Sequence, residues 1–248
     1  MADNWTSYLW NVNGKLASIF INLGLAGNAP IASKSWLLWL WVYFKAPRPD
    51  GLSDGDEAPT LFLIEDALNE LVCRECRALP CGRITTEGRR EFYFYGETKD
   101  GFRRAVQTAL AGFHGYKRSH GEQEDLQWKQ YFDVLYPPRE AFERIRNRDL
   151  LEVLVKQGDV LTAERDVQHW LFFPSKASRA SFRKEAESAG FRTHSESLID
   201  GDRPFAVSIV RTQAVEQSLI DATVIELLRL ALRFDGDYDG WETPVTTH

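Results

Sequence analysis

Two consecutive prolines near the middle of the chain, Pro137 and Pro138, most constrain how these 248 residues can fold. A proline lacks the backbone N–H that a helix needs, and the residue before it avoids helical geometry, so no helix can run through the pair. The stretches on either side are each long enough for a domain with its own core. We therefore predict two domains, residues 1–138 and residues 139–248.

The first stretch carries strand and helix patterns in a recognisable order. Residues 5–12 and 16–23 flank Asn13-Gly14, which favours a β-hairpin, and residues 126–135 suggest a helix that stops at the prolines. Between them the patterns predict β-α-β-β-α-β over residues 35–44, 57–77, 81–86, 91–95, 101–112 and 113–119. The first of these strands is apolar without alternation, as expected of a strand covered on both faces.

The second stretch repeats this order after a leading helix at residues 141–157. Strands are predicted at 166–173, 191–198, 205–211 and 238–245, and helices at 175–189 and 215–234. This order is the split βαβ, or ferredoxin-like, arrangement, in which two helices cover one face of a four-stranded antiparallel sheet. The predicted fold class is α+β, with two ferredoxin-like antiparallel α/β sandwich domains.

Composition disfavours several classes of protein. The chain has 30 basic against 36 acidic residues and a net charge of −6, so we expect no direct nucleic-acid binding. The most apolar run, residues 35–44, is about half the ~20 residues of a membrane helix. The first residues do not resemble a secretory signal, and the three cysteines fit a reducing compartment, so we expect a cytoplasmic protein without a membrane partner.

Two sequence patterns resemble metal sites. Cys73-x-x-Cys76 with Cys81 could share a zinc ion, but the pair falls near the C-terminal end of a predicted helix and lacks a fourth ligand of suitable spacing. The segment from Asp235 to Gly240 copies the opening of a calcium loop, but Thr246 stands where a bidentate glutamate is required. We expect no metal and no cofactor.

Two further features have both a structural and a functional interpretation. Strand alternation places His169 on the same face as Leu171, which favours a buried core histidine over a catalytic base. The aromatic residues Phe92–Tyr95 point to both faces of their strand, where they could stack RNA bases. Such platforms need flanking basic residues, so we favour packing in the core or between domains.

Several motifs carry a resemblance to known families. Residues 166–243 resemble the RraB family, regulators of ribonuclease E, through Gln168–Phe172, Ala189–Phe191, Leu219–Ala222 and Tyr238–Trp241. Residues 1–136 resemble an uncharacterised family often fused ahead of such a module, through residues 83–86, 90–95 and 125–131.

The resemblance implies a non-catalytic module that binds a ribonuclease and lowers its activity. The partner-binding residues would be Tyr238, Asp239, Gly240, Trp241 and Asp221. Family members that regulate ribonuclease E typically end in a strongly acidic tail, whereas this chain ends at residues 244–248, so the identity of the target stays open. The alternatives are a small-molecule-sensing or hydrolytic role for the N-terminal domain, or a structural assembly subunit.

Overall fold

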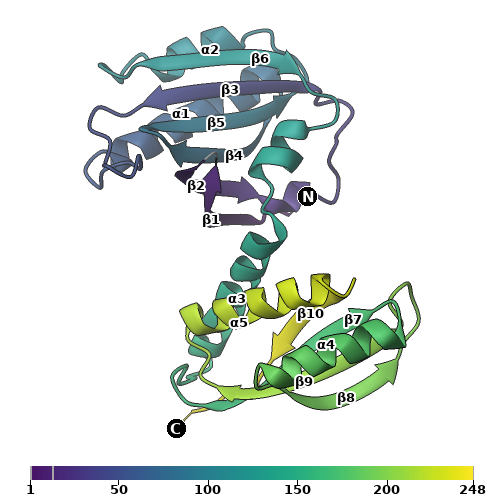
Figure 1. The fold of residues 1–248 in the computed structure, drawn as a ribbon. Helices are drawn as coiled ribbons and strands as arrows, with labels where there is room; N and C mark the ends of the chain where they lie inside the picture. The colour runs from purple at the N-terminus through teal and green to yellow at the C-terminus, as the bar shows by residue number, and fades with distance from the viewer. Residues whose placement is uncertain (1, 13, 248) are drawn as a thin grey trace. The chain divides into compact units, whose positions relative to one another are not determined.

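A computed structural model describes residues 2–12 and 14–247. The chain forms two compact units, Met1–Ala141 and Phe142–His248. Each unit contains an antiparallel sheet and its own helices (Figure 1). Within the described residues, none of the helices combines the length and the apolar character that a membrane span requires.

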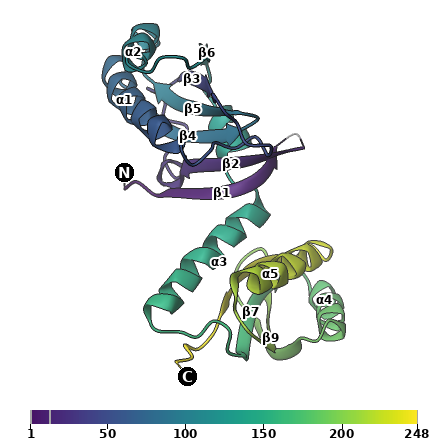
Figure 2. The same cartoon turned by 90° about the vertical axis from the view of Figure 1, so that its left-hand side faces the viewer.

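The N-terminal unit contains a six-stranded antiparallel sheet with the spatial order β1-β2-β4-β5-β3-β6. Helices α1 (Ala58–Cys76) and α2 (Phe102–Ala109) lie on one face of it (Figure 2). Strands β3 to β6 and these two helices form a split βαβ unit, which confirms the predicted ferredoxin-like fold, and the β1–β2 hairpin extends the sheet beside β4. The strands are β1 (Trp5–Val12), β2 (Lys15–Asn22), β3 (Trp36–Tyr43), β4 (Leu79–Thr86), β5 (Arg89–Gly96) and β6 (Arg118–Glu124).

Strand β3 is covered differently on its two faces. Leu38, Leu40 and Val42 are fully buried in the core that includes residues of α1 and α2. On the opposite face Trp39 and Trp41 are only half-buried. Leu37, on the same face as these two tryptophans, is buried, so the strand is covered fully on the helix side and only in part on the other side.

Two predicted elements of this unit were placed wrongly. The last strand, predicted at residues 113–119, is β6 at Arg118–Glu124, because the chain first turns at Gly115, whose φ is +84°. The helix predicted over residues 126–135 is a short π-helical turn, η2 (Gln130–Leu135). Strands β1 and β2 form an antiparallel pair that runs from Trp5 opposite Asn22 to Val12 opposite Lys15. Asn13 of the predicted Asn13-Gly14 turn lies outside the described residues.

The π-helical turn has a physical origin in its first residues. The Asp125 carboxylate accepts the backbone N–H groups of Lys129 and Gln130, at 2.9 and 3.1 Å. Trp128 adopts a left-handed φ of +54°, and its fully buried ring stacks on Tyr95 with 4.0 Å between ring centroids. This packing of one aromatic ring on the sheet outweighs the local preference for a regular helix.

The C-terminal unit begins with helix α3 (Arg139–Lys156), which starts at the end of the first unit. Its sheet has four antiparallel strands in the order β10-β7-β9-β8. This is the strand order of a ferredoxin-like domain, again as predicted. The elements that follow α3 are β7 (Arg165–Phe173), α4 (Lys176–Ser188), β8 (Arg192–Leu198), β9 (Phe205–Gln213), α5 (Gln217–Leu232) and β10 (Asp237–Glu242).

A buried ion pair holds the end of the chain against the loop between α3 and β7. Asp159 and Arg165 pair at 2.5 Å, with side chains 0% and 4% exposed. Asp159 also accepts the backbone N–H of Thr246 at 2.8 Å, and the N–H of Val160 donates to the Thr246 carbonyl. The pair thus joins two segments that are distant in sequence.

Substitution Asp159→Ala is expected to destabilise the C-terminal unit by about 3 kcal/mol, because it leaves the Arg165 guanidinium buried without its counter-charge. Urea unfolding measures the loss. The control is Asp149→Ala, which breaks an exposed pair with Arg148 and should cost less than about 1 kcal/mol. Equal losses of unfolding free energy in the two variants would contradict this prediction, because the buried pair would then stabilise the unit no more than the exposed pair does.

Candidate functional site

The segment expected to bind a partner, Tyr238–Trp241, forms the edge strand β10. Tyr238 pairs with Leu171 of β7, while Gly240 pairs with Trp170, so Asp239 is an extra residue in a β-bulge. In a regular strand, residues three positions apart point to opposite faces, but the bulge places Tyr238 and Trp241 on the same face.

Tyr238 lies in the core of the unit. Its side chain is 0% exposed, and its hydroxyl is 3.0 Å from Nδ1 of His169. Burial raises the pKa of the phenol well above its ordinary value. Tyr238 therefore anchors β10 to the sheet and cannot itself touch a partner in this conformation, which corrects its assignment as a contact residue.

Trp241 and Asp221 are joined through an asparagine of α3. The indole Nε1 of Trp241 donates to Oδ1 of Asn147 at 2.8 Å, and the Asn147 amide donates to Asp221 at 2.8 Å. Gln217 also donates to Asp221, at 3.0 Å. The predicted residues Trp241 and Asp221 thus belong to one hydrogen-bonded chain, which connects β10, α3 and α5.

Asn147 is only 1% exposed, and the sequence analysis assigned it no role. Its partners lie 74 and 94 residues away along the chain, and no local motif marks a helical asparagine that bridges such distant positions. A buried amide must find partners for both its donor and its acceptor, and Asp221 and Trp241 supply one of each.

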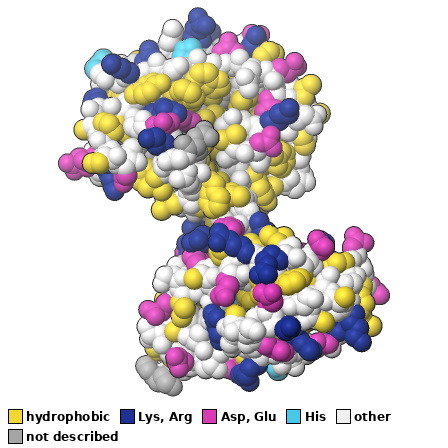
Figure 3. All heavy atoms as spheres, viewed as in Figure 1, with side chains coloured by type: hydrophobic (Ala, Val, Ile, Leu, Met, Phe, Trp, Pro, Cys, Tyr) yellow, Lys and Arg dark blue, Asp and Glu magenta, His cyan; other side chains and the backbone are white. Residues whose placement is uncertain are grey.

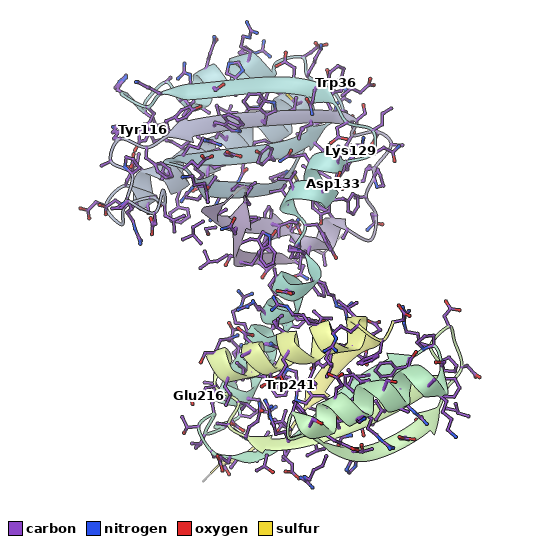
Figure 4. All side chains as sticks on the ribbon, viewed as in Figure 1. Trp36, Tyr116, Lys129, Asp133, Glu216 and Trp241 are labelled. Carbon is purple, nitrogen blue, oxygen red and sulfur yellow. The ribbon has the colours of Figure 1, made fainter. Side chains whose placement is uncertain are left out.

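The solvent-facing part of this region consists of Asp239, Gly240, the half-buried Trp241 and two arginines of α3. Nη2 of Arg146 lies 3.4 Å from the position that a Cβ at Gly240 would occupy. Arg144, half exposed, lies 3.9 Å from the Asp221 carboxylate. Figure 4 shows Trp241 among the side chains near α5. We call these residues the Trp241 face.

A groove of about 590 Å³ shares Arg144 with the Trp241 face. Its floor includes Ile225, which is 5% exposed, and Arg233, the residue directly after α5, forms an ion pair of 3.3 Å with Glu185 of α4. Its apolar floor and charged rim have the character of a protein-binding groove. The remaining lining residues are Ala189, Ala222, Glu226, Arg229 and Leu230.

Comparison with known proteins identifies both units. Residues 144–243 match the family "Regulator of ribonuclease activity B" (RraB), and residues 3–136 match a family of unknown function, DUF695. Regulator of ribonuclease activity B from Escherichia coli K12 is 33% identical over 104 residues, which are 41% of this chain and 75% of that protein. The chain belongs to the RraB family. Its N-terminal unit belongs to DUF695.

Other relatives agree with this placement. The Salmonella typhi protein of the same name is 31% identical over 104 residues, 41% of this chain and 75% of that protein. A solved structure of an unknown protein from Galdieria sulphuraria is matched over 86% of this chain and 99% of that chain, at 12% identity and with a TM-score of 0.23.

His169 of the RraB unit is a core residue, as its strand position predicted. It is 0% exposed, and its ring lies against Phe191 and Tyr238. Burial, followed by the charge of Arg211, lowers the pKa of His169 to about 3. An imidazole that stays neutral at all physiological pH values and faces the core cannot exchange protons with a substrate.

The cysteines and the calcium-like segment do not assemble a site. Cys76 and Cys81 are buried, and burial raises the pKa of the Cys76 thiol to about 11. Asp237 and Asp239 belong to strand β10, and Asp235 precedes it in a left-handed turn. Across residues 2–12 and 14–247, His, Cys, Asp and Glu side chains form no group of three or more that could hold a metal ion.

The aromatic residues Phe92–Tyr95 of the DUF695 unit are all buried, which confirms packing over base stacking at these positions. Phe92 and Phe94 belong to the core on the helix side. On the opposite face Tyr95 is covered by Trp128, and its hydroxyl donates to Asp125 at 2.6 Å.

The buried histidine generates a pH prediction. In the unfolded chain His169 titrates near 6.5, so between pH 6.5 and about 3 the unfolded state binds one more proton than the native state. Above pH 6.5 the free energy of unfolding does not depend on the titration of His169. As the pH falls below 6.5, the free energy of unfolding decreases by up to about 1.4 kcal/mol per pH unit. Urea unfolding at pH 7, 5.5 and 4.5 measures this slope.

His169→Gln, which keeps a hydrogen-bonding group near Tyr238, is expected to have a shallower slope over this range than the parent chain. The matched control is His194→Gln, because His194 is exposed on β8 and should leave the slope unchanged. Parallel slopes in the parent chain and in His169→Gln would contradict the prediction.

Proposed function

We propose that the chain is a non-catalytic regulator that acts in the cytoplasm by binding a ribonuclease through its RraB unit. Membership of the RraB family is the observation that carries this proposal. The buried His169 and the buried thiols support a non-catalytic role, since these groups are held neutral and away from solvent.

The surface we assign to the partner is the Trp241 face together with the groove between α4 and α5. Trp241 is fixed by its hydrogen bond to Asn147, so the half-exposed indole needs little further ordering when it is covered. Arg144 and Arg146 stand beside it, and tryptophan and arginine are the residues most enriched at energetically important interface positions. Inhibition would follow from occlusion, with this surface covering a segment that the ribonuclease needs.

The proposal predicts that the purified chain forms a complex with a ribonuclease E-type enzyme and slows its cleavage of RNA. Trp241→Ala should weaken the complex roughly thirtyfold, as expected for loss of about 2 kcal/mol at an interface anchor. Calorimetric titration gives the affinity, and a cleavage assay gives the inhibition.

Leu198→Ala is the control. Leu198 is an apolar side chain that is 71% exposed on β8, which is the edge strand opposite to β10 in the RraB sheet. Its substitution should leave the complex intact. Absence of a complex at micromolar concentrations, or the same loss in both variants, would refute the assignment.

A further inference from the structure

In the RraB unit, helices α3, α4 and α5 all contribute to the core on one face of the sheet. Residues of the three helices pack with Val167 and Leu171 of the central strand β7. Because side chains alternate along a strand, Gln168, Trp170 and Phe172 point to the other face. We call this second face, which these helices leave uncovered, the open face.

The two central strands carry no charged side chain on the open face. Three pairs of residues cross it from β7 to β9, namely Gln168 with Val210, Trp170 with Ser208, and Phe172 with Ala206. A sheet face that meets water normally carries polar and charged side chains, whereas this one has two half-buried aromatic rings at its centre. By contrast, Lys, Arg, Asp and Glu side chains are spread over the side of the unit that carries α4 (Figure 3). The open face has the composition of an interface core.

Large and small side chains are separated on the open face. The residues of β7 are large, while those of β9 and β8 beside them are small, because Ser195 of β8 pairs with Ser208 and Ser197 pairs with Ala206. Ser208 and Ala206 are at most 2% exposed, so they lie below the level of the half-buried rings of β7. One half of the face is therefore raised and the other half is low.

A face of this kind fits a second copy of itself. A twofold axis parallel to the strands, between β7 and β9, places Trp170 of each copy over Ser208 of the other and Phe172 over Ala206. The raised half of one copy then meets the low half of the other, and the side chains interleave across the about 10 Å that separates packed sheets. A twofold axis across the strands would instead place the large residues of β7 on each other.

The charged residues of the open face agree with the same axis. Glu242 of β10 pairs with Gln168, and Arg192 of β8 pairs with Val210, so the two charges stand in one row at opposite edges of the sheet. Glu242 is exposed, and it lines a hollow of about 340 Å³ on this face with Gln168 and Val210. Only Nη2 of Arg192 donates to Asp166, at 3.2 Å, so its other nitrogens can reach a second carboxylate. The twofold axis places Glu242 of each copy over Arg192 of the other.

The size of the open face sets the expected strength of association. Strands β7 and β9 have nine residues each, β8 has seven and β10 has six. At about 3.3 Å per residue and about 4.8 Å between strands, the face measures roughly 25 Å by 19 Å. Two such faces bury roughly 1,000 Å², which is near the lower limit for a specific interface. Association through this face is therefore expected to be weak and reversible.

We propose that two copies of the chain form a dimer through the open faces of their RraB sheets, about a twofold axis parallel to β7 and β9. Trp170 and Phe172 form the uncharged centre of the interface, and the ion pairs between Glu242 and Arg192 lie at its rim. The open face includes neither Trp241 nor the groove between α4 and α5. The dimer and the proposed ribonuclease complex can therefore fail independently.

Sedimentation velocity of the full chain, from about 2 to about 200 µM, brackets the affinity expected for an interface of this size. Monomer and dimer should exchange with a dissociation constant of about 1 to 100 µM. Trp170→Ala should raise this constant at least about thirtyfold, because a symmetric interface loses two central indoles at once.

An exchange of charges tests the axis. Glu242→Arg and Arg192→Glu should each raise the dissociation constant about tenfold, because each replaces two attractive contacts by two repulsive ones. An equimolar mixture of the two variants should associate within about threefold of the parent chain, since each altered charge then faces its opposite in the other copy.

Lys184→Glu and Leu219→Ala are the matched controls. They reverse an exposed charge on α4 and remove an exposed apolar side chain from α5, so both act on the helix side and should leave the dissociation constant unchanged.

Three outcomes would overturn the proposal. These are a chain that stays monomeric at about 200 µM, a dissociation constant unchanged by Trp170→Ala, and no recovery of association in the mixture of charge variants. Thermal unfolding of each variant establishes that it is folded. The two charge variants and their mixture decide the matter where Trp170→Ala does not fold.

Discussion

The one-residue bulge at Asp239 is the constraint on which the site of the RraB unit depends. It lets an edge strand send both Tyr238 and Trp241 toward the side where α3 and α5 pack. Tyr238 then fills the core beside His169, and Trp241 reaches Asn147. Without the extra residue, one of these two side chains would point to the opposite face, and the hydrogen-bonded chain from β10 through α3 to Asp221 of α5 could not form.

This arrangement also explains why the most recognisable motif of the chain is only partly a contact surface. Tyr238 is as buried as any residue of the core, and its role is to fix the strand, while Trp241 is half-exposed and held by a hydrogen bond. A sequence motif shows which residues occur together. It does not distinguish residues that hold the strand in place from residues that are exposed to a partner. Burial makes that distinction here.

The order of the elements was predictable from sequence, because alternation in strands and helical spacing in helices repeat over several residues. The ferredoxin-like topology of both units follows from that order, since split βαβ connections have few solutions. Three features were not predictable. The position of β6 depends on a turn at Gly115, and the π-helical turn depends on the stacking of Trp128 on Tyr95. The bridging role of Asn147 depends on hydrogen-bond partners that are far away in the sequence. Each of these is decided by tertiary contacts that local patterns do not contain.

The two units share a topology but differ in what is added to it, and the additions decide which surface each presents. In the RraB unit the added helix α3 packs beside α5 and β10, so the candidate surface forms on the helix side around Asn147 and Trp241. In the DUF695 unit the β1–β2 hairpin widens the sheet, and the segment around Trp128 covers part of its helix-free face, where Trp39 and Trp41 of β3 stay half-buried. A shared fold therefore implies no shared function, because the added elements cover different parts of the two units.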